Sequence, residues 1–180
     1  MTIFLVRHTR TSCKPGICYG HSDVGLPASF CMDRGKVADE LGDRSFDTIY
    51  SSPSSRCRLL AAFLAGGQNV IHDDRLMELN FGRWEMKSWD SIAASPEGNT
   101  WFADYLQVRC PGGESYMDLI QRVEHFMEDH IIGAKGDILI VSHAGTIRAL
   151  LILLNNENPR DVFCRPVDTG CVLRLQNSFR

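Results

Sequence analysis

The sequence predicts an α/β fold with a mostly parallel sheet. Residues 3–6 and 138–141 are apolar throughout, which is typical of strands buried on both faces. Runs of this kind alternate along the chain with stretches of helical apolar periodicity. The chain has 180 residues, a length that suits one domain, and its sequence contains no internal repeat or linker.

The first half of the chain supplies a long loop, two helices and a second strand. Residues 9–27 form an irregular stretch after the first strand, and stretches of that length in a compact domain are usually functional or mobile. We expect a helix over residues 28–41, a strand over residues 48–50, and then a helix with Ser52 as its cap and Pro53 at its first position. Its expected apolar stripe is Leu59, Leu60, Phe63 and Leu64.

The second half continues the alternation. We expect a short strand at residues 70–71 and a helical stretch over residues 88–106, broken near residues 95–98. The clearest helix follows Ser115, which can cap it, with Asp118 near the amides of the first turn. One face of that helix carries Leu119, Ile120, Val123, Phe126, Met127 and Ile131. A buried helix over residues 147–154 and a strand over residues 171–175 complete the prediction.

Composition and charge exclude several classes of protein. The longest apolar run, residues 149–154, is far below the ~18 residues that span a bilayer. The formal net charge of −3 disfavours a nucleic-acid partner bound through bulk charge. Seven cysteines, without a C-x-x-C pair, favour a reducing, cytoplasmic setting. Of 19 basic residues, 15 are arginine, whose planar fork suits phosphate and carboxylate oxygens.

Each of the two apolar strands runs directly into a histidine. Arg7 and His8 follow the first, and Ser142 and His143 follow the second. Ligands of open α/β sheets bind beyond the carboxyl ends of the strands, so both histidines would face one crevice if the strands are neighbours. Arg56, in the first turn of its helix, could point into the same crevice. This combination suggests phosphoryl chemistry, although lone strand-end histidines and most arginines are surface or capping residues.

Five segments, in order, resemble the histidine phosphatase superfamily of phosphoglycerate-mutase-like enzymes. They are residues 5–9 (LVRHT), 51–53 (SSP) with Arg56, 76–85 (LMELNFGRWE), 111–115 (PGGES) and 141–145 (VSHAG). The resemblance implies a three-layer sandwich, with helices on both faces of a mostly parallel central sheet. It also implies that residues 1–180 form a single histidine phosphatase domain.

The same resemblance implies roles for individual residues. His8 would be the nucleophile that becomes phosphohistidine, and Glu78 would be the proton donor. Arg7, Arg56 and His143 would bind the transferring phosphoryl group, His143 as part of the catalytic set, and the hydroxyl of Thr11 would contact phosphate. Positive charge from these groups would replace a metal ion, so no metal and no cofactor is expected.

Some positions depart from the family pattern. The family's usual glycine and glutamate after the histidine are Thr9 and Arg10 here, its asparagine falls at Lys14, and the glycine after Trp84-Glu85 is Met86. Whether Arg10 or Lys14 supplies the missing phosphate contacts stays open.

One branch of the family resembles the opening of this chain more closely. RHT at residues 7–9, followed by GICYG at residues 16–20, resembles the α-ribazole phosphatases. That resemblance implies hydrolysis of α-ribazole 5′-phosphate to α-ribazole in cobalamin biosynthesis. Substrate contacts are then expected from Tyr19, Gly20, His21 and Trp84, the aromatic rings stacking on the planar base.

The sequence leaves other functions open. A broad-specificity sugar-phosphate phosphatase, a phosphoglycerate-mutase-type enzyme and a non-catalytic relative that binds phosphorylated ligands would use the same segments. In each case the expected partner is a small phosphorylated molecule rather than a nucleic acid or a membrane, and the protein could be a monomer or a homodimer. The sequence has no C-x₅-R loop, no P-loop and no H-E-x-x-H pattern.

Overall fold

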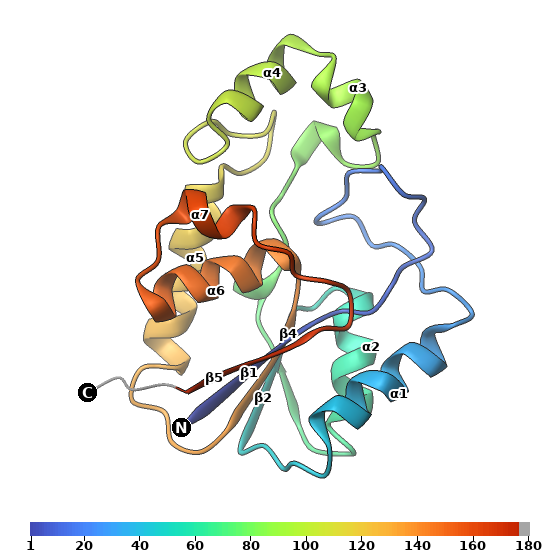
Figure 1. Ribbon diagram of the computed structural model, residues 1–180, viewed down its shortest axis with the longest axis vertical. Coiled ribbons are helices and arrows are strands. Elements are labelled where there is room, and N and C mark those ends of the chain that lie inside the picture. Colours follow the sequence, from blue (N-terminus) through green and yellow to red (C-terminus); the bar gives the residue numbers. More distant parts are fainter. Residues whose placement is uncertain (177–180) are drawn as a thin grey trace.

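A five-stranded sheet forms the centre of the protein, in a computed structural model that describes residues 1–176. The strand order is β3-β2-β4-β1-β5 (Figure 1). Four strands are parallel, and only β5 runs antiparallel, against β1. The predicted mostly parallel α/β sheet is confirmed. The strands are β1 (Thr2–Arg7), β2 (Thr48–Ser51), β3 (Val70–His72), β4 (Ile138–Ser142) and β5 (Val172–Gln176).

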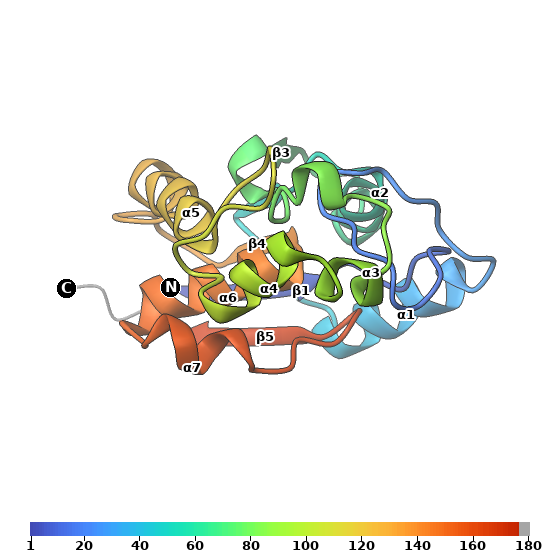
Figure 2. The same ribbon diagram turned by 90° about the horizontal axis from the view of Figure 1, so that it is seen from above.

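Helices cover both faces of this sheet. Helices α1 (Phe30–Leu41) and α2 (Ser55–Leu64) pack on one face, and α5 (Tyr116–His130) and α6 (Ala144–Asn155) on the other (Figures 1 and 2). Because successive side chains of a strand point to opposite faces, β1 serves both layers. Ile3 and Leu5 belong to the α5–α6 side, whereas Phe4 and Val6 belong to the α1–α2 side.

Several shorter helices and turns complete the fold. Helices α3 (Trp89–Ala93) and α4 (Pro96–Ala103) stand away from the sheet, at the top of Figure 1, and α7 (Pro159–Phe163) connects α6 to β5. The 3₁₀ turns η1 (Asp74–Leu76) and η2 (Gly82–Trp84) lie in the chain between β3 and α3. Within residues 1–176, no helix has the length and apolar character needed to cross a membrane.

Helix α5 forms as its sequence predicts. The Ser115 hydroxyl accepts from the Asp118 amide at 3.2 Å, and the Asp118 carboxylate accepts from the Ser115 amide at 2.8 Å. This reciprocal pair is a capping box, which satisfies two backbone donors at the helix start. All six side chains of the predicted apolar face are buried against the core.

The prediction for α2 is wrong in two respects. The helix begins at Ser55 after Ser54, so Ser52 and Pro53 lie before it. Leu59 and Phe63, which were expected to be buried, are 47% and 39% exposed. The buried side of the helix carries Arg56, Cys57, Leu60 and Ala61 instead, because the helix turns its polar first turn toward the end of β4.

Candidate active site

Two histidines lie together at the carboxyl edge of the sheet. β1 pairs with β4 in parallel, with Arg7 opposite Ser142, so the chain leaves both strands at the same level. The rings of His8 and His143 then meet edge to face, with centroids 5.2 Å apart. Both side chains are buried. The prediction that neighbouring strands bring the two histidines into one crevice is confirmed.

Arg56 lies against His143 with no exposed surface. Its Nη2 donates to the Gly20 carbonyl at 2.6 Å and lies 3.3 Å from His143 Nδ1, and its Nη1 donates to the Ser22 carbonyl at 3.0 Å. The guanidinium is therefore held between the loop after β1 and the end of β4.

Arg7 brings a second guanidinium to the same edge. Its Nη1 donates to the Val167 carbonyl at 2.6 Å. The Nε atoms of Arg7 and Arg56 are buried without a hydrogen-bond partner among residues 1–176, and neither arginine forms an ion pair with a carboxylate there. Burial of a charge without a counter-ion costs free energy, so this edge of the sheet is suited to an anion.

Two serines hold the second ring nitrogen of His143. Nε2 lies 2.8 Å from the Ser52 hydroxyl and 3.2 Å from the Ser54 hydroxyl. Because the Arg56 guanidinium beside Nδ1 can only donate, Nδ1 is the acceptor and the proton of the neutral ring lies on Nε2, facing these two hydroxyls. Ser52 therefore contacts His143 instead of capping α2.

Glu78 lies between a loop and the start of α6. Its two carboxylate oxygens accept from the Leu79 amide at 2.9 Å and from the Gly145 amide at 3.0 Å. A Cβ atom at position 145 would collide with Glu78 Oε1, so only glycine allows this approach. Arg122 of α5 fixes the same loop: it donates to the Glu78 carbonyl at 2.8 Å and forms an ion pair with Glu114, also at 2.8 Å.

Electrostatics keep both histidines uncharged near neutral pH. Burial, and next the charge of Arg56, lowers the pKa of His8 to about 3. Burial, followed by His8 and Arg56, also lowers the pKa of His143 well below its usual value. The Nδ1 of His8 is 2.7 Å from the Thr9 carbonyl, which can only accept, so Nδ1 carries the proton. The lone pair is consequently on Nε2.

A cavity of about 230 Å³ joins these groups. Arginine guanidinium groups, a neutral imidazole and a carboxylate meet there, and together they can hold a phosphoryl group, attack its phosphorus and exchange a proton. The lining residues are Arg7, His8, Ile17, Tyr19, Arg56, Glu78, Phe81, Trp89 and His143.

Comparison with known proteins shows the family of this chain. The sequence matches the histidine phosphatase superfamily (branch 1) over residues 3–178. The chain belongs to that superfamily. Its fold and the predicted resemblance are thereby confirmed.

Named relatives of this histidine phosphatase act on different substrates. Phosphoserine phosphatase 1 of Hydrogenobacter thermophilus is 32% identical over 163 residues, covering 84% of this chain and 75% of the relative. The adenosylcobalamin/alpha-ribazole phosphatase of Escherichia coli K12 is 26% identical over 177 residues, covering 95% and 87%. The crystal structure of the alpha-ribazole phosphatase from Shigella flexneri matches with a TM-score of 0.87 and 27% identity, covering 98% and 90%.

Of the predicted substrate contacts, Tyr19 lines the catalytic cavity of this histidine phosphatase, whereas Gly20, His21 and Trp84 do not. Tyr19 lines the cavity, and its hydroxyl lies 3.1 Å from that of Thr11, which is outside the lining. Gly20 and His21 are also outside it. The backbone of Gly20 is hydrogen-bonded to Arg56 and Glu85, and that of His21 to Glu85. Stacking by Trp84 is a wrong prediction, since this ring is 4% exposed and is packed edge to face on Trp101.

Several residues of the site region were missed from the sequence, among them Ile17, which lines the catalytic cavity. Phe81 and Trp89 line the cavity, and Glu85 binds the loop that holds Arg56. The aromatic residues that follow Glu78 in the sequence are the available signal, but periodicity cannot tell which of them face a cavity. The signal for Glu85 is only its place at the end of the segment 76–85.

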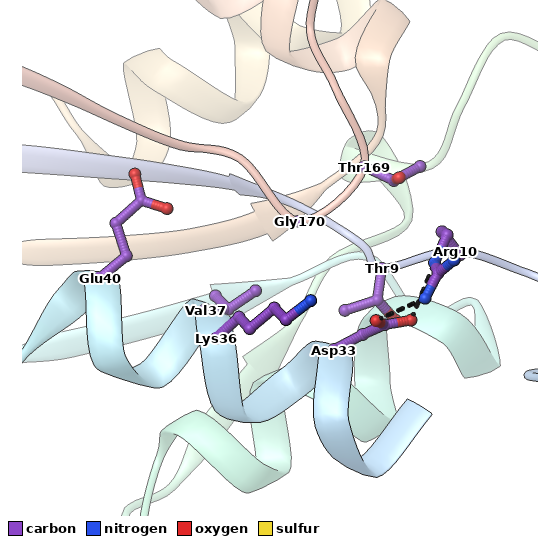
Figure 3. Close-up of a pocket in the computed structure, with 8 residues that line it drawn as sticks. All are labelled: Thr9, Arg10, Asp33, Lys36, Val37, Glu40, Thr169 and Gly170. Carbon is purple, nitrogen blue, oxygen red and sulfur yellow. Dashed lines mark hydrogen bonds and ion pairs between the residues drawn. The ribbon is translucent and has the colours of Figure 1, made fainter. Parts of the chain in front are cut away.

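Arg10 and Lys14, the substituted positions considered as replacements for the family's phosphate contacts, do not line the catalytic cavity. Arg10 lies on a separate cavity of about 300 Å³ beside α1, where its Nη2 pairs with the Asp33 carboxylate at 2.8 Å (Figure 3). Lys14 lines a third cavity, together with Met86. Across residues 1–176, no group of three or more His, Cys, Asp and Glu residues is arranged to hold a metal ion.

Proposed function

We propose that this histidine phosphatase hydrolyses phosphomonoesters through a phosphohistidine at His8. The observation that carries the proposal is a neutral, buried imidazole beside two arginines that have no carboxylate partner within residues 1–176. The Nε2 lone pair of His8 is the nucleophile, and its tautomer is fixed by the Thr9 carbonyl.

Side chains of the protein stabilise the negative charge of the transferring phosphoryl group. Arg7 and Arg56 supply positive charge to the equatorial oxygens of the phosphoryl group. His143 lines the same cavity and holds Arg56 there, because its Nδ1 accepts from Arg56 Nη2 while its Nε2 is bound to the Ser52 hydroxyl. These donors are held before substrate arrives, so they need little reorganisation during transfer. The reaction then requires no metal ion.

The reaction consists of two displacements at phosphorus. In the first, His8 Nε2 forms a bond to phosphorus while the bond to the ester oxygen breaks, and Glu78 protonates the departing alcohol. In the second, Glu78 takes a proton from water, whose oxygen attacks phosphorus and breaks the N–P bond. The products are the alcohol and inorganic phosphate, and Glu78 returns to its protonated form.

For the physiological substrate we propose α-ribazole 5′-phosphate. A second, mainly apolar cavity of about 180 Å³ shares Glu78, Phe81 and Trp89 with the catalytic one. It continues past the proton donor, where a leaving group would lie, and its aromatic walls suit a planar base. The other residues that line it are Leu79, Trp101, Tyr116, Gly145, Arg148 and Phe163.

Phosphoserine is the strongest competing substrate, because a phosphoserine phosphatase shares 32% identity with this chain. A serine leaving group needs partners for both an ammonium and a carboxylate. Of the two charged side chains that line the second cavity, Glu78 and Arg148, Glu78 is already assigned as the proton donor, which leaves Arg148 alone. The aromatic surface therefore favours the larger planar group. A generalist sugar-phosphate phosphatase or a mutase would use the same catalytic cavity, and a non-catalytic relative would bind its phosphorylated ligand there.

The deciding experiment compares kcat/KM for α-ribazole 5′-phosphate, O-phospho-L-serine and 3-phosphoglycerate. We expect the first to be preferred by at least about tenfold, or ~1.4 kcal/mol in transition-state binding. Trp89→Ala should lower kcat/KM for α-ribazole 5′-phosphate by about tenfold more than for phosphoserine, because stacking contributes ~1–3 kcal/mol per base. A preference for phosphoserine, or none at all, would overturn the substrate assignment.

A further inference from the structure

Glu85 is a half-buried carboxylate outside the catalytic cavity, held by four backbone amides. Oε1 accepts from Gly20, His21 and Phe81 at 3.1, 3.0 and 3.2 Å, and Oε2 accepts from Gly20 and Ser22, both at 3.0 Å. Within residues 1–176 it forms no ion pair. Burial raises the pKa of Glu85, but the hydrogen bonds from Gly20, Ser22 and His21 outweigh burial and hold the pKa below its usual value. The carboxylate is therefore ionised near neutral pH.

The same short segment, residues 20–22, holds Arg56 from its other side. The carbonyls of Gly20 and Ser22 accept from the Arg56 guanidinium at 2.6 and 3.0 Å, while the amides of both residues donate to Glu85. Negative charge thus faces the N–H groups of the segment and positive charge faces its C=O groups. Each charge polarises these peptides in the direction that strengthens the hydrogen bonds to the other.

The segment has little freedom to adopt another position. A Cβ atom at Gly20 would collide with the Leu79 carbonyl, so the chain passes in direct contact with the residue after Glu78. The Phe81 amide shares the Glu85 carboxylate, and the Phe81 ring lines the catalytic cavity. Glu85 therefore ties three parts of the site together: the Arg56 clamp, the loop of the proton donor and a wall of the cavity.

We propose that Glu85 is a positioning residue for phosphoryl transfer, acting through residues 20–22 to hold the Arg56 guanidinium against the transferring group. The proposal rests on the function proposed for the cavity. Without the carboxylate, four amides lose their acceptor and the two carbonyls lose their fixed position. Arg56 then turns away from the place where it meets the phosphoryl oxygens, and misplacement by about 1 Å can cost 10²-fold in rate.

A double-mutant cycle separates this role from a general loss of stability. Glu85→Gln keeps the size of the side chain but removes its charge and turns an NH₂ group toward amide donors. We expect it to lower kcat/KM for p-nitrophenyl phosphate by about 10- to 100-fold. Arg56→Met should lower it further, and the double variant should match Arg56→Met within about threefold, because the effect of Glu85 passes through Arg56. Multiplication of the two single effects would overturn the proposal.

Asp118→Asn provides the matched control. Asp118 is another hydrogen-bonded carboxylate with a pKa below its usual value, but its partners are Ser115 and Arg109 in the cap of α5. Combined with Arg56→Met, its effect should multiply. Thermal unfolding of each variant measures its stability independently of activity. If Glu85→Gln does not fold, the double-mutant cycle is repeated with Glu85→Asp, which keeps the charge.

Binding of orthovanadate, measured by calorimetry, repeats the cycle without turnover. Failure of the wild-type protein to hydrolyse any phosphomonoester would contradict the proposed function, while the orthovanadate cycle would still test the Glu85–Arg56 coupling. We expect Glu85→Gln to weaken orthovanadate binding about tenfold or more. Wild-type affinity in a folded Glu85→Gln variant would overturn the positioning role.

Discussion

Replacement of Glu78 by glutamine should separate substrates by how much their leaving groups need a proton. The two oxygens of Glu78 accept from the Leu79 and Gly145 amides at 2.9 and 3.0 Å. Glutamine has the same length and keeps one acceptor oxygen, but its NH₂ group meets a backbone donor and it cannot supply the proton. The change therefore removes one hydrogen bond and the acid function while the side chain remains in place.

The two losses differ in size. A hydrogen bond of this kind contributes about 1 kcal/mol to folding stability, and its loss does not depend on which substrate is bound. General acid catalysis contributes ~10²–10⁴-fold, and only where the departing oxygen is a poor leaving group. Glu78→Gln should thus slow an alkyl phosphate such as ribose 5-phosphate by 10²- to 10⁴-fold more than it slows p-nitrophenyl phosphate.

The assay measures phosphate release from both substrates by the wild-type protein and by Glu78→Gln. Glu114→Gln is a suitable control, because Glu114 supports the same loop through Arg122 without lining the catalytic cavity. It should lower both rates by a similar factor. Equal losses on both substrates in Glu78→Gln would refute the acid role and assign Glu78 to binding or structure.

Three further predictions concern stability and metal dependence. Met86 has a left-handed φ of 64° and is 53% exposed. Met86→Gly should relieve ~1–2 kcal/mol of backbone strain but cost ~0.5–1 kcal/mol of conformational entropy. The Tm should therefore rise by about 2 °C, and an unchanged or lower Tm would count against this. The folded pKa of His8, about 3, is below its unfolded value of 6.5, so its contribution to stability is complete above pH 6.5 and is lost as the pH falls toward 3. Denaturant titrations should show that the wild-type protein loses about 2 kcal/mol more between pH 7 and 5 than His8→Ala does, whereas parallel losses would contradict the lowered pKa. Activity should survive EDTA, and recovery of a lost activity on addition of Mg²⁺ would show that the arginine–histidine cavity is not sufficient.

The fold was predictable where apolar pattern and packing agree. Residues 3–6 and 138–141 are buried strands because their side chains are apolar on both faces, and Ser115 with Asp118 caps α5 through local hydrogen bonds. Helix α2 was not predictable in this way. Its orientation follows from the contacts that Arg56 and Cys57 make with the end of β4, so charged and sulfur-bearing residues are buried while Leu59 is exposed.

Some residues of the candidate site could likewise be predicted from the sequence, and others could not. His8, His143 and Arg56 could be placed from the sequence because strand ends and a helix start fix their positions in a parallel sheet. Glu78 could be found only by resemblance, since a loop carboxylate carries no signal of its own. Trp89 was missed and Trp84 misplaced because loop folding decides which ring faces the cavity, and here hydrogen bonds between distant segments set that folding.

Capture of the phosphoenzyme tests the central claim most directly. Brief reaction with a ³²P-labelled phosphomonoester, followed by denaturation, should give a labelled protein whose label is lost in acid and kept in alkali. The label should map to the peptide that contains His8 and should be absent from His8→Ala. Accumulation of the same label in His8→Ala, or phosphate release by that variant at the wild-type rate, would contradict the account.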